Sequence, residues 1–241
     1  MSKITELAEI SHVVIQNEMT QTTDNTMQFN KARIVSYSKM IDETGKDLNL
    51  LEQVAYCARV SNPENQNNHL TSDKLCKYLL KHHHYSPFEM VNICVEIETT
   101  RDISRQIIRH RSFSFQEFSQ RYALATNFTT RECRIQHPTN RQMSVIVDNE
   151  ELSQKFTDLQ KELIQKEKEY YDFCIENKIA KEQSRVILSE GLTKTKLYMN
   201  GTLRSWIHYL NVRTNKDDTQ AEHVDIAVKI KKEINKIFPL E

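Results

Sequence analysis

A short segment in the middle of the chain concentrates side chains that can bind anions. Residues 105–123, RQIIRHRSFSFQEFSQRYA, contain four arginines, one histidine and three serines. A guanidinium offers a planar fork of N–H donors to phosphate or carboxylate, and a serine hydroxyl can add a further hydrogen bond. The segment therefore predicts a site for an anionic ligand.

The cations around this segment are segregated by type. No lysine occurs between Lys81 and Lys155, although this stretch contains eight arginines. Lysine would serve solubility equally well, whereas arginine suits bidentate contact with phosphate and stacking on flat rings. The segregation therefore favours a binding role for some of the arginines.

Helical spacing would bring several of these groups to one surface. On a helix over 101–109, Arg101, Arg105 and Arg109 recur every four residues and share a face. Gln106 lies three residues before Arg109, so both side chains could reach the same ligand.

Ion pairing is the structural alternative for each single arginine. Asp102, Glu98 and Glu117 are near in sequence, and Glu117 with Arg121 has the i, i+4 spacing of a common helical pair. The set of Arg109, His110 and Arg111 together with Ser119 and Arg121 is harder to explain in this way.

Composition excludes the common phosphate-binding loops. The 241-residue chain has only three glycines, so neither GxGxxG nor GxxxxGK[ST] can be written with them. Any phosphate must therefore be held by side chains. Lysine plus arginine equals aspartate plus glutamate at 33 each, so no net charge draws the chain to nucleic acid or an anionic membrane.

Metal, disulfide and membrane functions are not indicated. The five cysteines are scattered without a CxxC pair, which favours reduced thiols. His82, His83 and His84 would point about 100° apart on a helix, and no HExxH pattern accompanies them, so no metal site is predicted. No apolar run approaches the roughly 18 residues of a membrane span and no signal peptide is evident, so a cytoplasmic protein is expected.

Residue periodicity predicts the elements that position the segment. Strands are expected at 32–38 and at 91–100, the second from strict alternation of apolar and polar residues. Helices are expected at 49–61, 71–86, 101–109, 150–177, 202–213 and 219–237. The helix at 150–177 carries an apolar stripe of Leu152, Phe156, Leu159 and Leu163.

These elements predict a mixed α/β class. We expect a single helix-rich domain around a small central β-sheet over residues 31–241, preceded by a polar arm at 1–30.

One pattern in the arginine-rich segment resembles a known family. Arg109, His110 and Arg111, followed by seven residues and Ser119, read RHRxxxxxxxS, which is similar to the signature of flavin-dependent thymidylate synthases. Further pieces agree in order and spacing: KHHHYSPFEM, SRVIL at 184–188, GTLRSWIHYLNVR at 201–213 and TQAEH at 219–223. From about residue 31 to 237 the chain resembles that family.

The resemblance implies an enzyme with the fold of that family that converts dUMP to dTMP by reductive methylation. The one-carbon unit would come from methylenetetrahydrofolate, and the reducing equivalents from NADPH through FAD. The family also implies a homotetramer whose active sites are shared between subunits.

Carried over residue by residue, the resemblance assigns three sets of positions. Those that would contact FAD are Ser86, Arg109, His110, Arg111, Glu117, Thr202, Arg204 and His208. Those that would hold dUMP are Gln106, Arg109, Glu117, Phe118, Ser119, Gln120, Arg121, Arg185 and Arg213. The catalytic set would be Arg213, Ser119 and His84.

The roles within the catalytic set also follow from the resemblance. Arg213 matches the residue that faces the uracil and favours its ionised form, and His84 matches a histidine near the flavin and folate. The chain departs from the family at Thr202 and His208, where asparagine is frequent.

Two alternatives stay open at this point. Arginines interleaved with Phe113, Phe115 and Phe118 could form a stacking groove for single-stranded nucleic acid, although such binders usually carry excess positive charge. A nucleotide sensor of the same fold without catalysis is the other.

Overall fold

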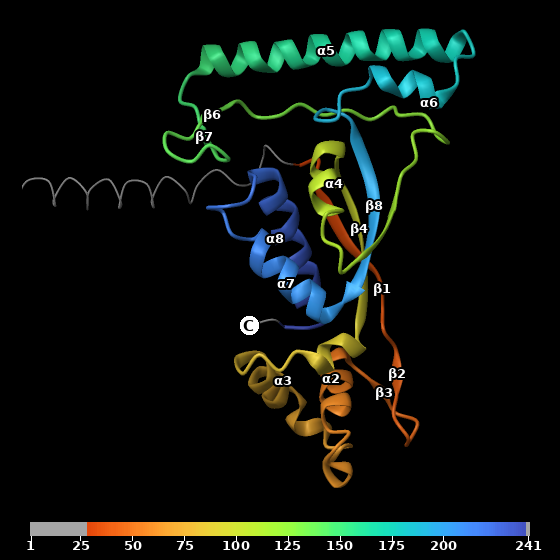
Figure 1. Cartoon of the computed structure of the whole chain (residues 1–241), viewed down its shortest axis with the longest axis vertical. Coiled ribbons are helices and arrows are strands. Elements are labelled where there is room, and N and C mark those ends of the chain that lie inside the picture. The colour runs from red at the N-terminus through yellow and green to blue at the C-terminus, as the bar shows by residue number, and fades with distance from the viewer. Residues whose placement is uncertain (1–27, 240–241) are drawn as a thin grey trace, which may run out of the picture.

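A four-stranded antiparallel sheet forms the centre of the computed structural model, which describes residues 28–239. Its strand order is β1 (Lys31–Tyr37), β4 (Asn92–Thr100), β8 (Lys194–Thr202), β5 (Ser114–Glu117). Figure 1 shows the three long strands running along the length of the molecule. The arm expected at residues 1–30 lies almost wholly outside the described residues.

One face of the sheet carries the core. Alternate side chains of β4 and β8 point to it and are fully buried, among them Val95, Ile97 and Leu197. The helices α7 (Leu203–Arg213) and α8 (Ala221–Asn235) cover this face and add Trp206 and Ile226 to the same core. Burial of these apolar side chains is the main force that holds the helices on the sheet.

Two helices follow their strands without a connecting loop. α4 (Arg101–Ile107) begins directly after β4, and α7 begins directly after β8, where the Thr202 side chain accepts a hydrogen bond from the Ser205 amide. Because β4 and β8 are antiparallel, α4 and α7 start at opposite ends of the sheet. Their C-terminal ends meet over the core face, where His110 and Arg213 are hydrogen-bonded.

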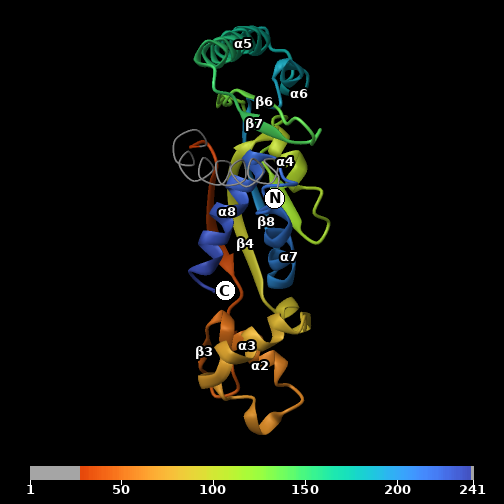
Figure 2. The same cartoon turned by 90° about the vertical axis from the view of Figure 1, so that its left-hand side faces the viewer.

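The remaining elements occupy the two ends of the molecule (Figures 1 and 2). One end holds β2 (Met40–Ile41), β3 (Asp47–Leu48), α2 (Leu50–Ala58), η1 (Pro63–Asn65), η2 (His69–Thr71), α3 (Ser72–Lys81) and η3 (Ser86–Met90). The other holds β6 (Arg134–Gln136), β7 (Ser144–Ile146), α5 (Glu150–Glu176), α6 (Lys181–Ser184) and η4 (Arg185–Ile187).

The long helix α5 lies at one end of the molecule (Figure 1), and most of its residues are exposed. The predicted stripe of Leu152, Phe156, Leu159 and Leu163 is 41%, 39%, 56% and 47% exposed. A helix of a single globular chain usually buries such a stripe against its core. In this chain the described residues leave about half of this stripe exposed, and α5 buries other residues instead, among them Tyr171 and Cys174.

The predicted mixed, helix-rich class with a small central sheet is confirmed, and most predicted elements are present within a few residues. The prediction missed helix α6 and every strand except β1 and β4, including β8 and β5 of the central sheet. It was also wrong that the helix at 101–109 includes Arg109, because α4 ends at Ile107. The helix expected to reach residue 86 ends at Lys81, because His83 adopts a φ of 58°, which is not helical.

Candidate active site

The central histidine of the RHR motif is bound to the predicted activating arginine. Arg213 Nε donates a hydrogen bond of 2.9 Å to His110 Nε2. His110 follows α4, and Arg213 is the last residue of α7, so the pair joins the ends of the two helices. The resemblance assigned these residues to two different ligands, the flavin and the uracil, and the structure makes them neighbours.

The His110 ring is neutral in this setting. Burial lowers the pKa of His110 to about 4, and the positive charges of Arg213, His208 and Arg109 lower it in the same direction. A neutral ring can offer a bare Nε2 to the Arg213 N–H, which leaves the ring proton on Nδ1. Among the described residues, no other hydrogen bond or ion pair engages the Arg213 guanidinium, so its terminal nitrogens remain for a ligand.

The side-chain amide of Gln106 is held by hydrogen bonds to two other residues. Its Oε1 lies 3.3 Å from Nδ1 of the buried His223, and its Nε2 lies 2.7 Å from Gln220 Oε1. The ring of Tyr209 packs at 4.9 Å from that of His110, and the Tyr209 hydroxyl lies 3.0 Å from His223 Nε2. Tyr209, Gln220 and His223 are not among the residues predicted for the site, although the TQAEH string at 219–223 contains the last two.

The eight arginines between 101 and 141 divide by their partners. Five are paired with acidic groups: Arg101 with Glu117, Arg105 with Glu190, Arg121 with Glu182, Arg131 with Asp102 and Glu222, and Arg134 with Glu222. Within the described part of the chain, Arg109, Arg111 and Arg141 have no acidic partner, and all three are exposed. Ion pairing therefore explains most of the segment but not the two arginines of the RHR motif.

Glu117 lies at the end of β5 rather than in a helix. It accepts a hydrogen bond of 2.9 Å from Thr195 Oγ1 and lies 3.6 Å from Arg101, so the helical pair considered with Arg121 does not form. Burial is the main cause that lowers the pKa of Arg101, and the charges of Arg105 and Arg185 lower it further. Arg185, at the start of η4, is therefore close enough to Arg101 for the two charges to interact.

The residues that follow β5 form a partly exposed loop. Phe118 and Ser119 are exposed, Gln120 is buried, and Arg121 is exposed beside Glu182. Among the described residues, no hydrogen bond or ion pair joins residues 118–121 to Arg213. The described residues therefore show no direct bond between these two parts of the predicted dUMP site.

A third group gathers at the opposite end of α7. Arg204 Nη1 donates to Glu89 Oε1 at 2.6 Å, and Thr202 Oγ1 donates to Glu89 Oε2 at 2.9 Å. Arg204, followed by Thr202, lowers the pKa of Glu89 despite partial burial. Ser86 begins the same η3 turn as Glu89, and the exposed His84 precedes it with its ring edge toward Tyr78.

The predicted flavin contacts therefore fall at both ends of α7. The helix has 11 residues, which corresponds to a length of about 16 Å at 1.5 Å per residue. His208 is exposed on the helix between the two groups. A ligand that touched all of them would have to be extended along α7.

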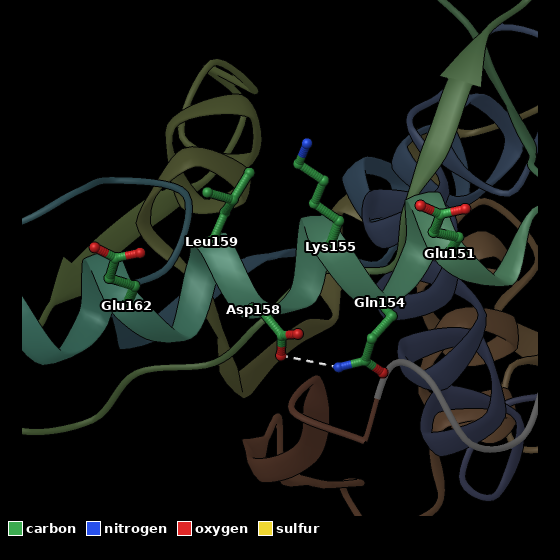
Figure 3. Close-up of a pocket in the computed structure, with 6 residues that line it drawn as sticks. All are labelled: Glu151, Gln154, Lys155, Asp158, Leu159 and Glu162. Carbon is green, nitrogen blue, oxygen red and sulfur yellow. Dashed lines mark hydrogen bonds between the residues drawn. The ribbon is translucent and has the colours of Figure 1, made fainter.

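A shallow hollow on α5 is not part of this arrangement. Figure 3 shows its lining residues, which all belong to one helix: Glu151, Gln154, Lys155, Asp158, Leu159 and Glu162. The dashed line in Figure 3 is the hydrogen bond of 2.9 Å from Gln154 to Asp158. None of the predicted site residues lines the hollow, and we assign no ligand to it.

Neither a metal centre nor a membrane span emerges from the described residues. No group of three or more histidine, cysteine, aspartate or glutamate side chains in residues 28–239 could hold a metal ion. In the same residues, no helix is both long enough and apolar enough to cross a bilayer.

Known proteins match this chain over most of its length. A model of the family described as thymidylate synthase complementing protein matches residues 39–240. A probable flavin-dependent thymidylate synthase of Paramecium bursaria Chlorella virus 1 is 42% identical over 86% of this chain and 95% of its own length. The flavin-dependent thymidylate synthase of Synechocystis sp. (strain ATCC 27184 / PCC 6803 / Kazusa) is 43% identical over the same shares.

A solved structure shares the fold. The UMP/dUMP methylase PolB from Streptomyces cacaoi, crystallised with 5-Br dUMP, superposes with a TM-score of 0.72. It is 23% identical, and the match covers 86% of this chain and 90% of that one. At this identity the likeness concerns the fold, and it agrees with the mixed α/β class.

Proposed function

Because the chain belongs to the thymidylate synthase complementing protein family, we propose that it is a flavin-dependent thymidylate synthase that methylates dUMP to dTMP. The one-carbon unit comes from methylenetetrahydrofolate, and NADPH supplies the reducing equivalents through FAD. Two relatives above 40% identity that carry this activity in their names, each matched over 95% of its length, support the assignment.

The observation that carries the proposal is the hydrogen bond between His110 and Arg213. A methyl group can be built on uracil only if the pyrimidine and the hydride donor lie side by side. A direct contact between the histidine expected at the flavin and the arginine expected at the uracil is the arrangement that this chemistry requires.

The side chains around this pair suit a dinucleotide. Arg109 and Arg111 are exposed and lack acidic partners among the described residues, so their charges are available to the phosphates of FAD. Three glycines leave no loop to cradle those phosphates, so arginine is the group that can hold them. At the other end of α7, the far part of the same cofactor would contact Thr202, Arg204 and Ser86. Arg204 would either keep its hydrogen bond to Glu89 or exchange it for one to the cofactor.

Bound FAD would supply hydride transfer, which no protein side chain can perform. The chain would orient the reactants and adjust their charge. Arg213, fixed by His110, would place positive charge beside the uracil and favour its ionised form, because a cation a few ångströms from an anion stabilises it. Arg185, Gln106 and Arg109 would hold the dUMP phosphate and sugar together with Ser119 and its neighbours.

We also propose that the active enzyme is a homotetramer with shared sites. The exposed apolar stripe on α5 supports association, because an uncovered stripe of this size is unusual in a monomer. Sharing is compatible with the absence of a direct hydrogen bond or ion pair between residues 118–121 and Arg213 among the described residues, since a second subunit could supply one of these groups.

The test begins with the absorbance spectrum of the purified protein. We expect a bound yellow flavin, and dTMP formation that requires dUMP, methylenetetrahydrofolate and NADPH together. Replacing both Arg109 and Arg111 by alanine should release the flavin, whereas Arg141→Ala should retain it, because Arg141 is equally exposed and unpaired but lies outside the motif. A folded protein that neither binds added FAD nor forms dTMP would rule out the proposal, and FAD binding without turnover would instead favour a sensor.

The single-stranded nucleic-acid alternative has no support. Phe113 is buried and packs against Trp206 with ring centroids 4.8 Å apart, and Phe115 packs against the same core. Of the three phenylalanines only Phe118 is exposed, so they do not form a continuous stacking surface.

A further inference from the structure

A row of hydrogen bonds runs beneath the proposed nucleotide site. It passes from Tyr209 Oη to His223 Nε2 at 3.0 Å, from His223 Nδ1 to Gln106 Oε1 at 3.3 Å, and from Gln106 Nε2 to Gln220 Oε1 at 2.7 Å. Gln220 Nε2 then donates to Glu222 Oε2 at 2.9 Å. Tyr209 and His223 are fully buried, and Glu222 is 1% exposed.

The carboxylate at the end of the row fixes the direction of every bond. Glu222 is paired with Arg131 and Arg134, so its oxygens only accept, and Gln220 must present its amide N–H to them. Gln220 Oε1 is then an acceptor, which requires the amide N–H of Gln106. Gln106 Oε1 must therefore accept from His223.

The same reasoning determines the tautomer of His223. Its Nδ1 carries the proton that is donated to Gln106, and its Nε2 is bare and accepts the hydroxyl proton of Tyr209. A neutral ring is required, and burial lowers the pKa of His223 to about 3, with Arg213 and His110 acting in the same direction. Each group in the row has one possible role.

We propose that His223 is a positioning residue for the nucleotide site, because it holds the Gln106 amide in a single orientation through the row from Tyr209 to Glu222. This inference rests on the proposed function, in which Gln106 contacts dUMP. A glutamine without such partners can rotate its amide by half a turn, and a ligand would have to select one orientation. His223 removes that ordering cost, and Gln106 keeps one amide N–H and one carbonyl lone pair for the nucleotide.

Two conservative variants separate positioning from simple packing. An asparagine can place an N–H near the position of imidazole Nδ1, and a glutamine can place an acceptor near that of Nε2. His223→Asn therefore keeps the bond to Gln106 and loses the one to Tyr209, whereas His223→Gln does the reverse. Each variant loses one buried hydrogen bond, so both should lower the melting temperature.

Positioning predicts that only one variant affects the nucleotide. In the FAD-loaded enzyme, His223→Gln should raise the Kd for dUMP roughly three- to tenfold, as expected for one lost hydrogen bond, while His223→Asn stays close to wild type. The effect of His223→Gln should vanish in a Gln106→Ala background. Equal dUMP affinity in both His223 variants would overturn the inference. So would a rise in the Kd for dUMP that His223→Gln still causes in the Gln106→Ala background.

A second measurement does not depend on dUMP. In protein with ¹⁵N-labelled histidine, the His223 signals identified by comparison with His223→Asn should show a protonated Nδ1 and a bare Nε2 at neutral pH. A protonated Nε2 would refute the row itself. Wild-type protein that shows the expected tautomer but does not bind dUMP would instead refute the proposed function and, with it, the role of the row at a nucleotide.

Discussion

The nitrogens of the Arg213 guanidinium have two different roles. Its Nε is committed to His110, and its terminal nitrogens have no partner among the described residues. One fixed bond is enough to orient a planar group, so the remaining N–H donors keep a defined direction. The charge of Arg213 can therefore act at one place on a ligand.

Replacing Arg213 should reduce turnover more than flavin binding. A hydrogen bond to a charged group is worth roughly 1.5 to 3 kcal/mol, so Arg213→Ala should lower kcat about ten- to a hundredfold while the flavin absorbance is retained. Arg213→Lys keeps the charge but loses the Nε bond to His110, and should recover only part of the rate. Wild-type kcat in Arg213→Ala would remove this residue from the catalytic role.

The two buried histidines predict how stability depends on pH. The pKa is about 4 for His110 and about 3 for His223, against an ordinary value of 6.5. Between pH 6.5 and about 5, unfolding therefore takes up protons at both rings, and the free energy of unfolding decreases as the pH falls. The acidic groups with a lowered pKa, such as Asp42 and Glu96 at about 2, lose their contribution at lower pH.

Urea unfolding of the flavin-free protein measured across this pH range tests the histidine contribution. The slope of unfolding free energy against pH should be shallower in His223→Asn, which lacks one of the two rings. A free energy that is constant from pH 7 to about 5 would contradict the neutral state of both rings.

At the scale of elements, a strand could be predicted only where apolar and polar residues alternate clearly in the sequence. β4 alternates three large apolar residues, Ile93, Val95 and Ile97, with polar ones and was predicted. β8 has the same period, but two of its inward positions are the polar Thr195 and the small Gly201, which give no clear apolar signal. The strand forms because β4 and β5 pair with both of its edges, which no local pattern shows.

The site was predictable only in part for a related reason. The RHR motif was predicted from its residue types together with the family resemblance, and Arg213 was assigned by the resemblance alone; both assignments stay predictions. The acidic partners of Arg105, Arg121 and Arg134 lie 60 to 90 residues away in sequence, so which arginines stay unpaired depends on tertiary structure. His223 has no signal of its own, since its role arises from contact with Gln106, more than 100 residues away.

Gly201 illustrates how β8 depends on close packing. A Cβ at this position would lie 2.4 Å from Cδ1 of Phe113, whose ring is enclosed by the core. Gly201→Ala should therefore destabilise the protein by about 1 to 3 kcal/mol, as overpacking of a core does. Gly191→Ala is the matched control, because a Cβ there meets no atom within 4 Å.

Thermal and urea denaturation of both glycine variants would measure this effect. Adding Phe113→Leu to Gly201→Ala should recover part of the lost stability, since the smaller side chain relieves the contact. If Gly201→Ala is as stable as wild type, Phe113 moves more freely than its packing indicates.

At the scale of the whole molecule, α5 is the helix whose apolar side chains a single chain does not bury fully. Its apolar stripe is exposed, and a second copy could cover it. Leu159→Glu should weaken self-association, because a carboxylate would enter the interface. Gln154→Glu adds the same charge elsewhere on the helix, beside Asp158, and should leave association unchanged (Figure 3).

Sedimentation velocity over a range of concentrations distinguishes these variants. Wild type and Gln154→Glu should sediment as the same oligomer, and Leu159→Glu as a smaller species. A wild-type chain that remains monomeric at all concentrations would reject both the stripe as an interface and the tetramer.

Sharing of the active site can be tested by co-expressing two variants that each have reduced activity. Ser119→Asp places a negative charge in the segment expected at the dUMP phosphate, and Arg213→Ala removes the expected activating charge. In the proposed shared site, Ser119 and Arg213 would come from different subunits, and within the described chain Arg213 is bonded to His110 but not to residues 118–121. Co-expressed variants should then form some sites with both residues intact, and dTMP formation should exceed the sum of the separate activities. If each site were built from one chain, every site in the mixture would carry one lesion and no activity would be regained.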